Sequence, residues 1–240
     1  MKKIFLFSIT LLILILNSCN KNDDNPTQQI PTSDKGLIAY YPFNGNAEDE
    51  SGNHFNGTVV GASLTSDRFG NYNKAYYFNG INNWIQANNY PQLNSNFSCC
   101  VWIKIDKTNI TDRGYNFGCY GKEGSGVATW DFGYNPVKQW FAVFNRPANA
   151  WAPGSSVNDD WHFVTIIFSS TKKSLYLDGK FVNSKDISTP INIMSNNDFR
   201  IGAHINDGSQ QFRGSIDDVR IFSRVLTETE IQQFFHEGGW

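Results

Sequence analysis

Acidic side chains are the first candidates for chemistry in this chain of 240 residues. Hydrolysis of a glycosidic bond needs two carboxyl groups facing one cleft, about 5 Å apart for retention of configuration and wider for inversion. The segments expected to line such a cleft, 127–132 and 140–144, contain a single acidic residue, Asp131. The acidic run Glu48 to Glu50 falls in a loop rich in glycine and asparagine, where charge is typically solvated or bound to metal. We therefore expect no catalytic residues.

Other catalytic patterns give no stronger signal. The sequence has no G-x-S-x-G string for a serine nucleophile, and its four histidines lie too far apart for a zinc motif such as H-E-x-x-H. A polysaccharide lyase would need tyrosine and histidine together in a groove. Tyr134 and His204 are the pair to inspect for that activity.

The density of Trp, Tyr, Asn and Gly between residues 113 and 161 is the strongest binding signal. Sugars stack their C–H faces on aromatic rings, and their hydroxyls pair with amides and carboxylates. Aromatic residues also fill β-sandwich cores, so Trp140, Phe141 and Phe144 are assigned to the core. The residues predicted to bind a ligand are Trp130, Tyr134 and Trp151 as exposed rings, with Asp131, Asn145 and Arg146 as polar contacts.

An oxygen-rich loop at residues 49–57 is the candidate metal site. Asp49, Ser51 and Asn53 offer side-chain oxygens, and the carbonyls of neighbouring glycines add backbone oxygens. Ca²⁺ takes six to eight oxygens at about 2.4 Å and accepts such a mixture of donors. A structural calcium ion is expected here, and the alternative is a loop of turn-forming residues without metal.

Short strands must position these residues. Apolar or period-two runs bounded by Gly, Asn, Asp and Pro recur along the chain, which is the pattern of an antiparallel all-β domain. The segment 161–168 is apolar on both faces, which predicts a central strand. Predicted strands lie at 37–43, 75–78, 84–87, 97–105, 127–132, 140–144, 161–168, 175–177 and 199–203.

Two local signals add a turn and a helix. Asp178 and Gly179 supply the positive φ angles that a two-residue hairpin turn needs. Thr227 with Glu230 forms a capping box, which predicts a helix from about residue 228 to 235. Glycines at 238 and 239 end it.

The two ends of the globular part carry a family resemblance. Residues 36–58 read GLIAYYPFNGNAEDESGNHFNGT, and residues 214–231 read GSIDDVRIFSRVLTETEI. These strings resemble the opening and closing strands of laminin-G-like, concanavalin A-like jelly-roll domains, and LYLDGKFV at 175–182 resembles a common hairpin of that family. The resemblance implies one antiparallel two-sheet jelly-roll sandwich over residues 36–240 with a short C-terminal helix. It also implies that Tyr40 and Val219 lie on neighbouring strands.

The same resemblance implies a function and a further metal ligand. The family mainly binds sugars or proteins, and its catalytic members carry extra acidic residues. Related domains often carry a structural calcium ion on an aspartate of a closing strand like IDDVRI. By that pattern Asp217 joins Asp49 and Asn53 as a ligand, with Asp218 as the second choice.

The N-terminal segment predicts export and lipid anchoring. Two lysines precede an apolar run at 4–16, which is too short to span a bilayer but has the length of a signal-peptide core. The following string, LNSC, resembles a bacterial lipobox, so residues 1–18 are predicted to be a signal peptide and Cys19 a lipidated anchor. The alternative is an ordinary secretory signal with an incidental cysteine. Residues 19–35 are polar and predict a disordered tether.

The charge of the chain limits the classes of partner that it can bind. Without the signal peptide, 18 basic and 22 acidic side chains leave a net charge of −4, and the basic residues are scattered singly. Nucleic acid is excluded as a partner, because its capture needs clustered Lys and Arg.

Cys99, Cys100 and Cys119 are predicted to be buried thiols, with a bridge from Cys119 to one of the other two as the alternative.

Together these observations predict a non-catalytic carbohydrate-binding domain of a lipoprotein on the bacterial cell surface, attached to the outer membrane. The glycan or polysaccharide is expected on the concave sheet face. One alternative is a protein-adhesion or envelope-scaffold module, which a flat apolar patch would favour. The other is a glycoside hydrolase or polysaccharide lyase, which needs convergent acidic groups, or Tyr and His, in a groove.

Overall fold

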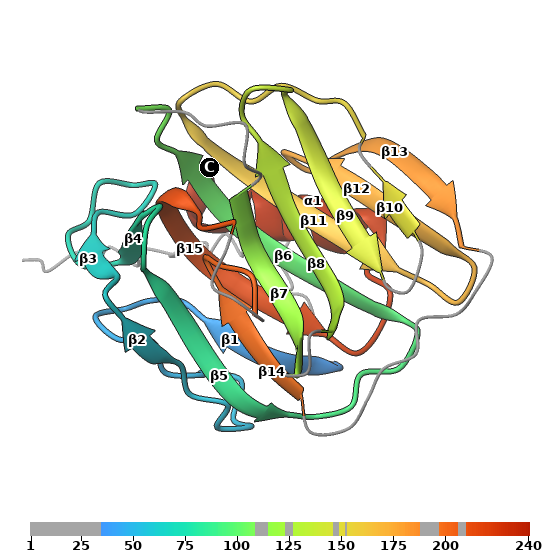
Figure 1. Ribbon diagram of the computed structural model, residues 1–240, viewed down its shortest axis with the longest axis horizontal. Coiled ribbons are helices and arrows are strands. Elements are labelled where there is room, and N and C mark those ends of the chain that lie inside the picture. Colours follow the sequence, from blue (N-terminus) through green and yellow to red (C-terminus); the bar gives the residue numbers. More distant parts are fainter. Residues whose placement is uncertain are drawn as a thin grey trace, which may run out of the picture. The chain divides into compact units, whose positions relative to one another are not determined.

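Two antiparallel sheets packed face to face make up the domain in this computed structural model (Figure 1). The structure describes residues 35–108, 115–122, 127–145, 149–151, 153–187, 197–205 and 210–240. All of them belong to one compact unit, residues 31–240. Cys19, the predicted signal peptide and nearly all of the predicted tether lie outside the described residues. Within the described ranges, no helix has the length and hydrophobicity to cross a bilayer.

The eight-stranded sheet contains, in spatial order, β13 (Lys180–Asp186), β12 (Lys172–Leu177), β11 (Trp161–Phe168), β6 (Phe97–Ile105), β15 (Arg213–Phe222), β4 (Ala75–Asn79) and β3 (Ser63–Thr65), and β1 (Leu37–Tyr41) also pairs with β15. The seven-stranded sheet contains β10 (Asn149–Trp151), β9 (Trp140–Asn145), β8 (Val127–Asn135), β7 (Tyr115–Lys122), β14 (Asn197–Ile201), β5 (Trp84–Tyr90) and β2 (Thr58–Val60). Helix α1 (Glu228–Phe235) and a 3₁₀ turn (Glu237–Gly239) follow β15.

The first and last strands, β1 and β15, pair with each other. Their antiparallel register sets Tyr40 opposite Arg220 and Tyr41 opposite Val219. The predicted adjacency of the two ends of the domain is therefore confirmed. β15 pairs with β6 along one side, while β4 and β1 share its other side. The last strand thus occupies the centre of the eight-stranded sheet.

Most strands follow the hydrophobic period of the sequence. The predicted segments 97–105 and 161–168 match β6 and β11 at both ends, and β11 is central because it lies between β12 and β6. Periodicity does not predict β7, whose sequence YNFGCYGK contains two glycines that weaken the strand signal. Gly118 is needed there because a Cβ atom would lie 2.3 Å from the ring of Phe132.

The hairpin between β12 and β13 forms as predicted. Asp178 has φ 49° and Gly179 has φ 73°, the left-handed conformations that a two-residue turn of this kind requires. The Asp178 carboxylate also accepts a hydrogen bond from the backbone N–H of Phe163 at 2.9 Å. The turn is thereby tied to the neighbouring strand β11.

The main core lies between the two sheets, and a second cluster lies on the outer face of the eight-stranded sheet. Neighbouring residues of β6 divide between them, because Cys99 belongs to the inner cluster and Cys100 to the outer one. Cys99, Cys100 and Cys119 are all buried, and none of them forms a disulfide. The prediction of unbridged thiols is confirmed.

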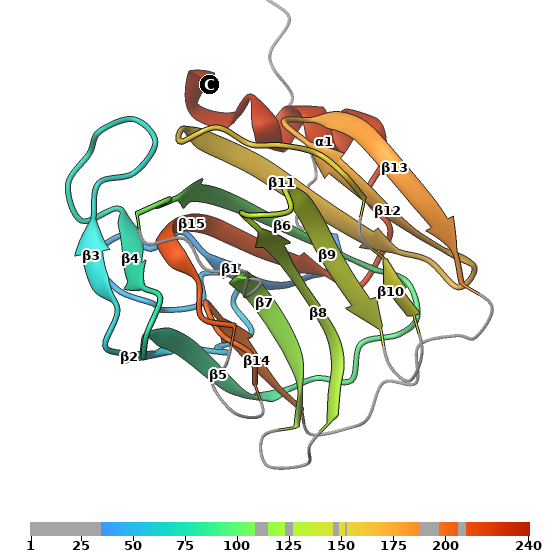
Figure 2. The same cartoon turned by 45° about the horizontal axis from the view of Figure 1, so that its top comes forward.

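Helix α1 covers the outer face of the eight-stranded sheet (Figure 2). Its N-terminus is the predicted capping box: Glu230 N–H donates to Thr227 Oγ1 at 3.2 Å, and Thr227 N–H donates to Glu230 Oε2 at 2.8 Å. Ile231 and Phe234 are the buried residues of the helix, and they pack in the cluster that contains Trp102 of β6. The outer surface left for a ligand on this sheet therefore lies away from α1.

Candidate functional site

Trp130 and Tyr134 lie in the core, so the prediction that they are exposed binding rings is wrong. Trp130 is 0% exposed, and its ring stacks on Tyr120 with a centroid distance of 5.6 Å and an interplanar angle of 8°. Tyr134 is 1% exposed and packs on Phe141. In β8, aromatic residues alternate with polar residues and glycine. The period of two that predicts this strand therefore also assigns its rings to the buried face.

The other predicted ligand contacts lie near the β10 edge of the seven-stranded sheet. Trp151 in edge strand β10 is half-buried, and Lys173 Nζ lies 5.9 Å from its ring centroid. The backbone of Asn145 pairs with Trp130 of β8 on one side. Arg146 lies outside the described residues. Of the three predicted binding rings, Trp151 alone keeps exposed surface.

Asp131 belongs to a buried polar row on the outer face of the seven-stranded sheet. In register, Asp131 lies opposite Cys119, Cys119 opposite Arg200, and Arg200 opposite Gln86. Arg200 Nε donates to Gln86 Oε1 at 2.7 Å, and its Nη1 donates to the carbonyl of His204 at 3.0 Å. All five residues are buried. The row therefore offers little open surface to a sugar.

Tyr134 and His204 do not form the pair that a lyase would need. The hydroxyl of Tyr134 accepts a hydrogen bond from the backbone N–H of Val157 at 3.4 Å, within the core. Nε2 of His204 instead lies 4.0 Å from Asp131 Oδ2 on the outer face. The seven-stranded sheet separates the two side chains.

Asp49, the first predicted calcium ligand, is surrounded by hydrogen-bond donors. Its Oδ1 accepts from the backbone N–H groups of Tyr40 and Ser51, each at 2.9 Å. Its Oδ2 accepts from the N–H of Phe55 at 3.0 Å and the hydroxyl of Ser51 at 2.9 Å. Asn53 donates Nδ2 to two backbone carbonyls of β1, at 3.2 and 3.0 Å. The hydrogen bonds of Asp49 use the carboxylate oxygens that a cation would need, and those of Asn53 tie the loop to β1.

Asp217, the third predicted calcium ligand, faces Arg68 in a buried charge network. Arg68 Nη1 lies 3.0 Å from Asp217 Oδ2 and 2.6 Å from Asp218 Oδ2. Asp218 also accepts from the hydroxyl of Tyr40 at 2.7 Å, and Arg220 lies 3.8 Å from it. Burial and the charge of Asp218 raise the pKa of Asp217 to about 8, although Arg68 opposes the shift. The guanidinium groups of Arg68 and Arg220 therefore lie beside the aspartates that the sequence suggests as calcium ligands.

Calcium binding stays a prediction, and the contacts of Asp49, Asn53 and Asp217 do not favour it. An ion held only by the folded state would raise stability, so its removal would lower the melting temperature. Because the contacts of these residues do not favour calcium, we expect the chelator EGTA to change the melting temperature of the full chain by less than about 1 °C. Differential scanning calorimetry with EGTA and with added calcium chloride checks this. A fall of several degrees that calcium reverses would contradict the expectation.

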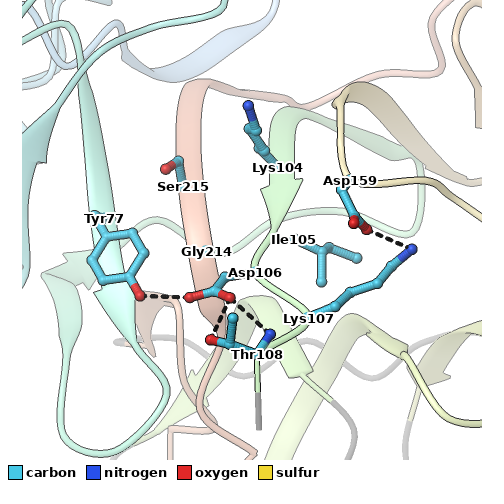
Figure 3. Close-up of a pocket in the computed structure, with 9 residues that line it drawn as sticks. All are labelled: Tyr77, Lys104, Ile105, Asp106, Lys107, Thr108, Asp159, Gly214 and Ser215. Carbon is cyan, nitrogen blue, oxygen red and sulfur yellow. Dashed lines mark hydrogen bonds and ion pairs between the residues drawn. The ribbon is translucent and has the colours of Figure 1, made fainter. Parts of the chain in front are cut away.

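A pocket of about 490 Å³ opens on the outer face of the eight-stranded sheet, beyond the end of β6 (Figure 3). Its lining consists of Tyr77, Lys104, Ile105, Asp106, Lys107, Thr108, Asp159, Gly214 and Ser215. The strand register sets Ser215 opposite Tyr77 on one side and Lys104 on the other. The volume falls within the range of small-molecule sites, about 300–1,000 Å³.

Asp106 is the centre of hydrogen bonding in the pocket (Figure 3). Its Oδ2 accepts from the hydroxyl of Tyr77 at 2.8 Å and from Arg213 Nε at 3.1 Å. Its Oδ1 accepts from the N–H and the hydroxyl of Thr108, at 2.8 and 2.6 Å. Burial opposes ionisation, but the hydrogen bonds from Thr108 and Tyr77 and the charge of Arg213 outweigh it and lower the pKa of Asp106. Asp106 is a fixed anion that orients two hydroxyl groups.

The two lysines of the pocket differ in their partners. Lys107 Nζ pairs with Asp159 Oδ1 at 2.7 Å and donates to the carbonyl of Val157 at 2.9 Å. Lys104 is exposed and has no ion-pair partner within the described part of the chain. The pocket therefore presents one ammonium group whose donors are available to a ligand.

Sequence reasoning misses this pocket because its residues meet through strand register. Lys104, Asp106 and Lys107 read as the polar end of a strand, and Tyr77 and Ser215 are far apart in the sequence. Their proximity follows from the pairing of β4 and β6 with the last strand, β15. The available signal is the string KIDKT, which contains the last two residues of β6 and the three polar residues that follow it.

The sequence matches a known family model. Residues 78–232, which extend from β4 into helix α1, match the third laminin-G family model, described as the concanavalin A-like lectin/glucanases superfamily. None of the curated protein sequences compared with the chain matches it.

Solved structures share the fold at low sequence identity. Domain 4 of AbnA, a GH43 extracellular arabinanase from Geobacillus stearothermophilus in complex with arabinotriose, has a TM-score of 0.65 and 19% identity over 82% of this chain and 97% of that chain. The binding domain of botulinum neurotoxin DC in complex with rat synaptotagmin II has a TM-score of 0.64 and 17% identity over 85% and 52%. The binding domain of Paraclostridial Mosquitocidal Protein 1 has a TM-score of 0.63 and 19% identity, also over 85% and 52%. This chain thus spans about half of each of these two binding-domain chains. The predicted jelly-roll sandwich is confirmed.

Proposed function

We propose, from the fact that this chain belongs to the concanavalin A-like lectin/glucanase superfamily, that it is a non-catalytic carbohydrate-binding protein. The observation that carries the proposal is the pocket around Asp106, which the ring of Tyr77 lines together with residues that carry hydroxyl, carboxylate and ammonium groups. We place an oligosaccharide in this pocket rather than on the outer face of the seven-stranded sheet, because the polar row there is buried.

The chemistry of the pocket suits a sugar. Saccharide hydroxyls both donate and accept hydrogen bonds, and the pocket offers the hydroxyls of Ser215, Tyr77 and Thr108 and the ammonium of Lys104. The Tyr77 ring adds an apolar face for C–H groups. Domain 4 of the arabinanase, which has the same fold, was solved with arabinotriose. These features together support saccharide as the ligand class.

The carboxyl groups of the pocket support binding rather than hydrolysis. Glycoside hydrolysis needs one carboxyl group with a raised pKa as the proton donor. The pKa of Asp106 is lowered, and Asp159 is held by Lys107. Both groups therefore suit acceptance of hydrogen bonds from sugar hydroxyls.

Protein binding is the second candidate, since the botulinum neurotoxin DC binding domain was solved with synaptotagmin II. A protein-binding surface would gather exposed apolar side chains into one patch. The most exposed apolar residues described here, including Tyr72, Ile81, Val137 and Phe181, come from different loops and strands. We therefore favour sugar over an envelope protein as the partner.

The proposal includes attachment to the bacterial cell envelope. The lipobox-like string ending at Cys19 supports lipid modification of that residue. A lipid anchor on the outer membrane would hold the domain where extracellular polysaccharide is encountered. Mass spectrometry of Cys19 in the mature protein tests this part separately from sugar binding.

Replacing Tyr77 with alanine is expected to weaken saccharide binding at least tenfold, about 1.4 kcal/mol, because it removes the apolar face and one oriented hydroxyl of the pocket. The measurement is a glycan array with the full chain that includes arabinotriose, followed by calorimetric titration of the best ligand. Tyr72→Ala is the matched control, since Tyr72 is 86% exposed and outside the pocket.

Two further variants separate the pocket from the other candidate surface. Lys104→Ala should weaken binding without loss of stability, because Lys104 has no ion-pair partner among the described residues. Trp151→Ala should leave binding unchanged. Loss of binding in Trp151→Ala with full binding in Tyr77→Ala would move the site to the seven-stranded sheet. Failure of the wild-type chain to bind any saccharide would overturn the proposed function.

A further inference from the structure

Three potential metal ligands converge on the outer face of the seven-stranded sheet. They are Cys119 of β7, Asp131 of β8, and His204, which follows β14. Their ligand atoms all lie within 4.8 Å of one another, and His204 Nε2 is 4.0 Å from Asp131 Oδ2. None of the three residues is more than 8% exposed. No other group of three such ligands occurs in the part of the chain that the structure describes.

The backbone holds these three side chains in place. Cys119 and Asp131 lie directly opposite each other in the β7–β8 ladder, which puts them on the same face of the sheet. The carbonyl of His204 accepts a hydrogen bond from Arg200 Nη1 at 3.0 Å. Ile205, the next residue, packs on Cys119 in a small buried cluster. The ligands therefore come from rigid strands and from a segment fixed against them.

The donor set identifies the class of cation. Ca²⁺ and Mg²⁺ take oxygen ligands, whereas Zn²⁺ is bound by thiolate at about 2.3 Å, by imidazole at about 2.0–2.1 Å and by carboxylate at about 2.0–2.2 Å. Tetrahedral geometry at these lengths separates the ligand atoms by about 3.3–3.6 Å. We propose that Cys119, Asp131 and His204 bind a zinc ion, whose fourth position is open to water or another ligand.

The neighbouring charges are compatible with a divalent cation. The thiolate and the carboxylate together carry two negative charges, which the ion neutralises. Arg200, which lies opposite Cys119 on the next strand, donates to the neutral amide of Gln86 and lies 4.9 Å from the ring of Trp84. Its Nη1 also donates to the backbone carbonyl of His204 at 3.0 Å, an atom distinct from the imidazole nitrogen that faces Asp131.

A cysteine nucleophile activated by histidine is the other chemistry that these residue types support. Such a nucleophile must reach a substrate, and Cys119 is fully buried against Ile205. Metal binding requires entry of a single small ion. Burial therefore favours the metal site over covalent catalysis.

The test uses the full chain, loaded with zinc and then freed of unbound metal by gel filtration. We expect one zinc per chain by elemental analysis, and a thiolate-to-metal charge-transfer band when Co²⁺ replaces zinc. Cys119→Ser and His204→Gln should each weaken zinc binding at least tenfold. Cys100→Ser is the matched control, because Cys100 is an equally buried thiol in the outer cluster and should leave zinc binding unchanged.

Zinc at 100 times its dissociation constant should also raise the melting temperature of the wild type by about 5–10 °C. Absence of bound zinc, or equal zinc affinity in Cys119→Ser and Cys100→Ser, would overturn the proposal. If Cys119→Ser does not fold, the cobalt spectrum of the wild type decides, since a spectrum without the thiolate band excludes Cys119 as a ligand. Tyr77→Ala should bind zinc like the wild type, which separates this proposal from sugar binding.

Discussion

Replacing Trp130 with alanine is expected to lower the free energy of unfolding by about 3–5 kcal/mol. The side chain is fully buried and packs against Tyr120, Phe97 and Phe199, from both sheets. Truncation leaves a large cavity that these rigid rings cannot fill. Urea denaturation of the full chain, followed by circular dichroism, measures the loss.

Trp151→Ala is the matched control for this core assignment. It removes the same side chain from a half-buried position in edge strand β10, where the expected loss is about 1 kcal/mol. A sugar-binding ring at Trp130 would give the opposite pattern. Loss of saccharide binding in Trp130→Ala with nearly unchanged stability would contradict the core assignment.

Replacing Arg68 with methionine is expected to destabilise the domain by about 3–5 kcal/mol near pH 8. The substitution leaves Asp217 and Asp218 buried beside each other without the cation that contacts both. The pKa of Asp217 is raised to about 8, so the folded state holds a proton that the unfolded state loses above its ordinary pKa near 4. This contribution to stability is fully present below pH 4 and is lost as the pH rises through 8. The cost of losing Arg68 should therefore be smaller at pH 5 than at pH 8.5.

Two variants control the Arg68 result. Lys172→Met breaks an exposed ion pair with Asp186, 3.8 Å apart, and should change stability by less than about 0.5 kcal/mol. The double variant Arg68→Met with Asp217→Asn should recover part of the loss, because it removes one uncompensated carboxylate. Urea denaturation at the two pH values measures all three variants. Equal losses for Arg68→Met and Lys172→Met would contradict a structural role for the buried network.

The fold is predictable from sequence where the signal is local. The apolar runs at 97–105 and 161–168 become β6 and β11, and the Asp178–Gly179 pair becomes a turn because few other residues adopt those angles. The capping box at Thr227 fixes the start of α1. The strands β2, β3 and β10 have three residues each, which is too short to show a period.

The candidate sites are less predictable because they arise from contacts between distant segments. Aromatic density alone does not separate a binding surface from a core, and Trp130 belongs to the core. The pocket at Asp106 and the cluster at Cys119 both depend on which residue of one strand lies opposite which residue of the next. The amino-acid composition of a segment does not show which residues of neighbouring strands lie opposite each other.

The central place of β15 has a consequence for biosynthesis. Until residues 213–222 leave the ribosome, β1 has no pairing partner, and β4 and β6 lack the strand that joins them. For most of translation, β1 and one edge each of β4 and β6 therefore stay unpaired, which exposes them to aggregation. Chaperone protection over this interval would then limit the yield of the native protein more than the intrinsic speed of any single hairpin.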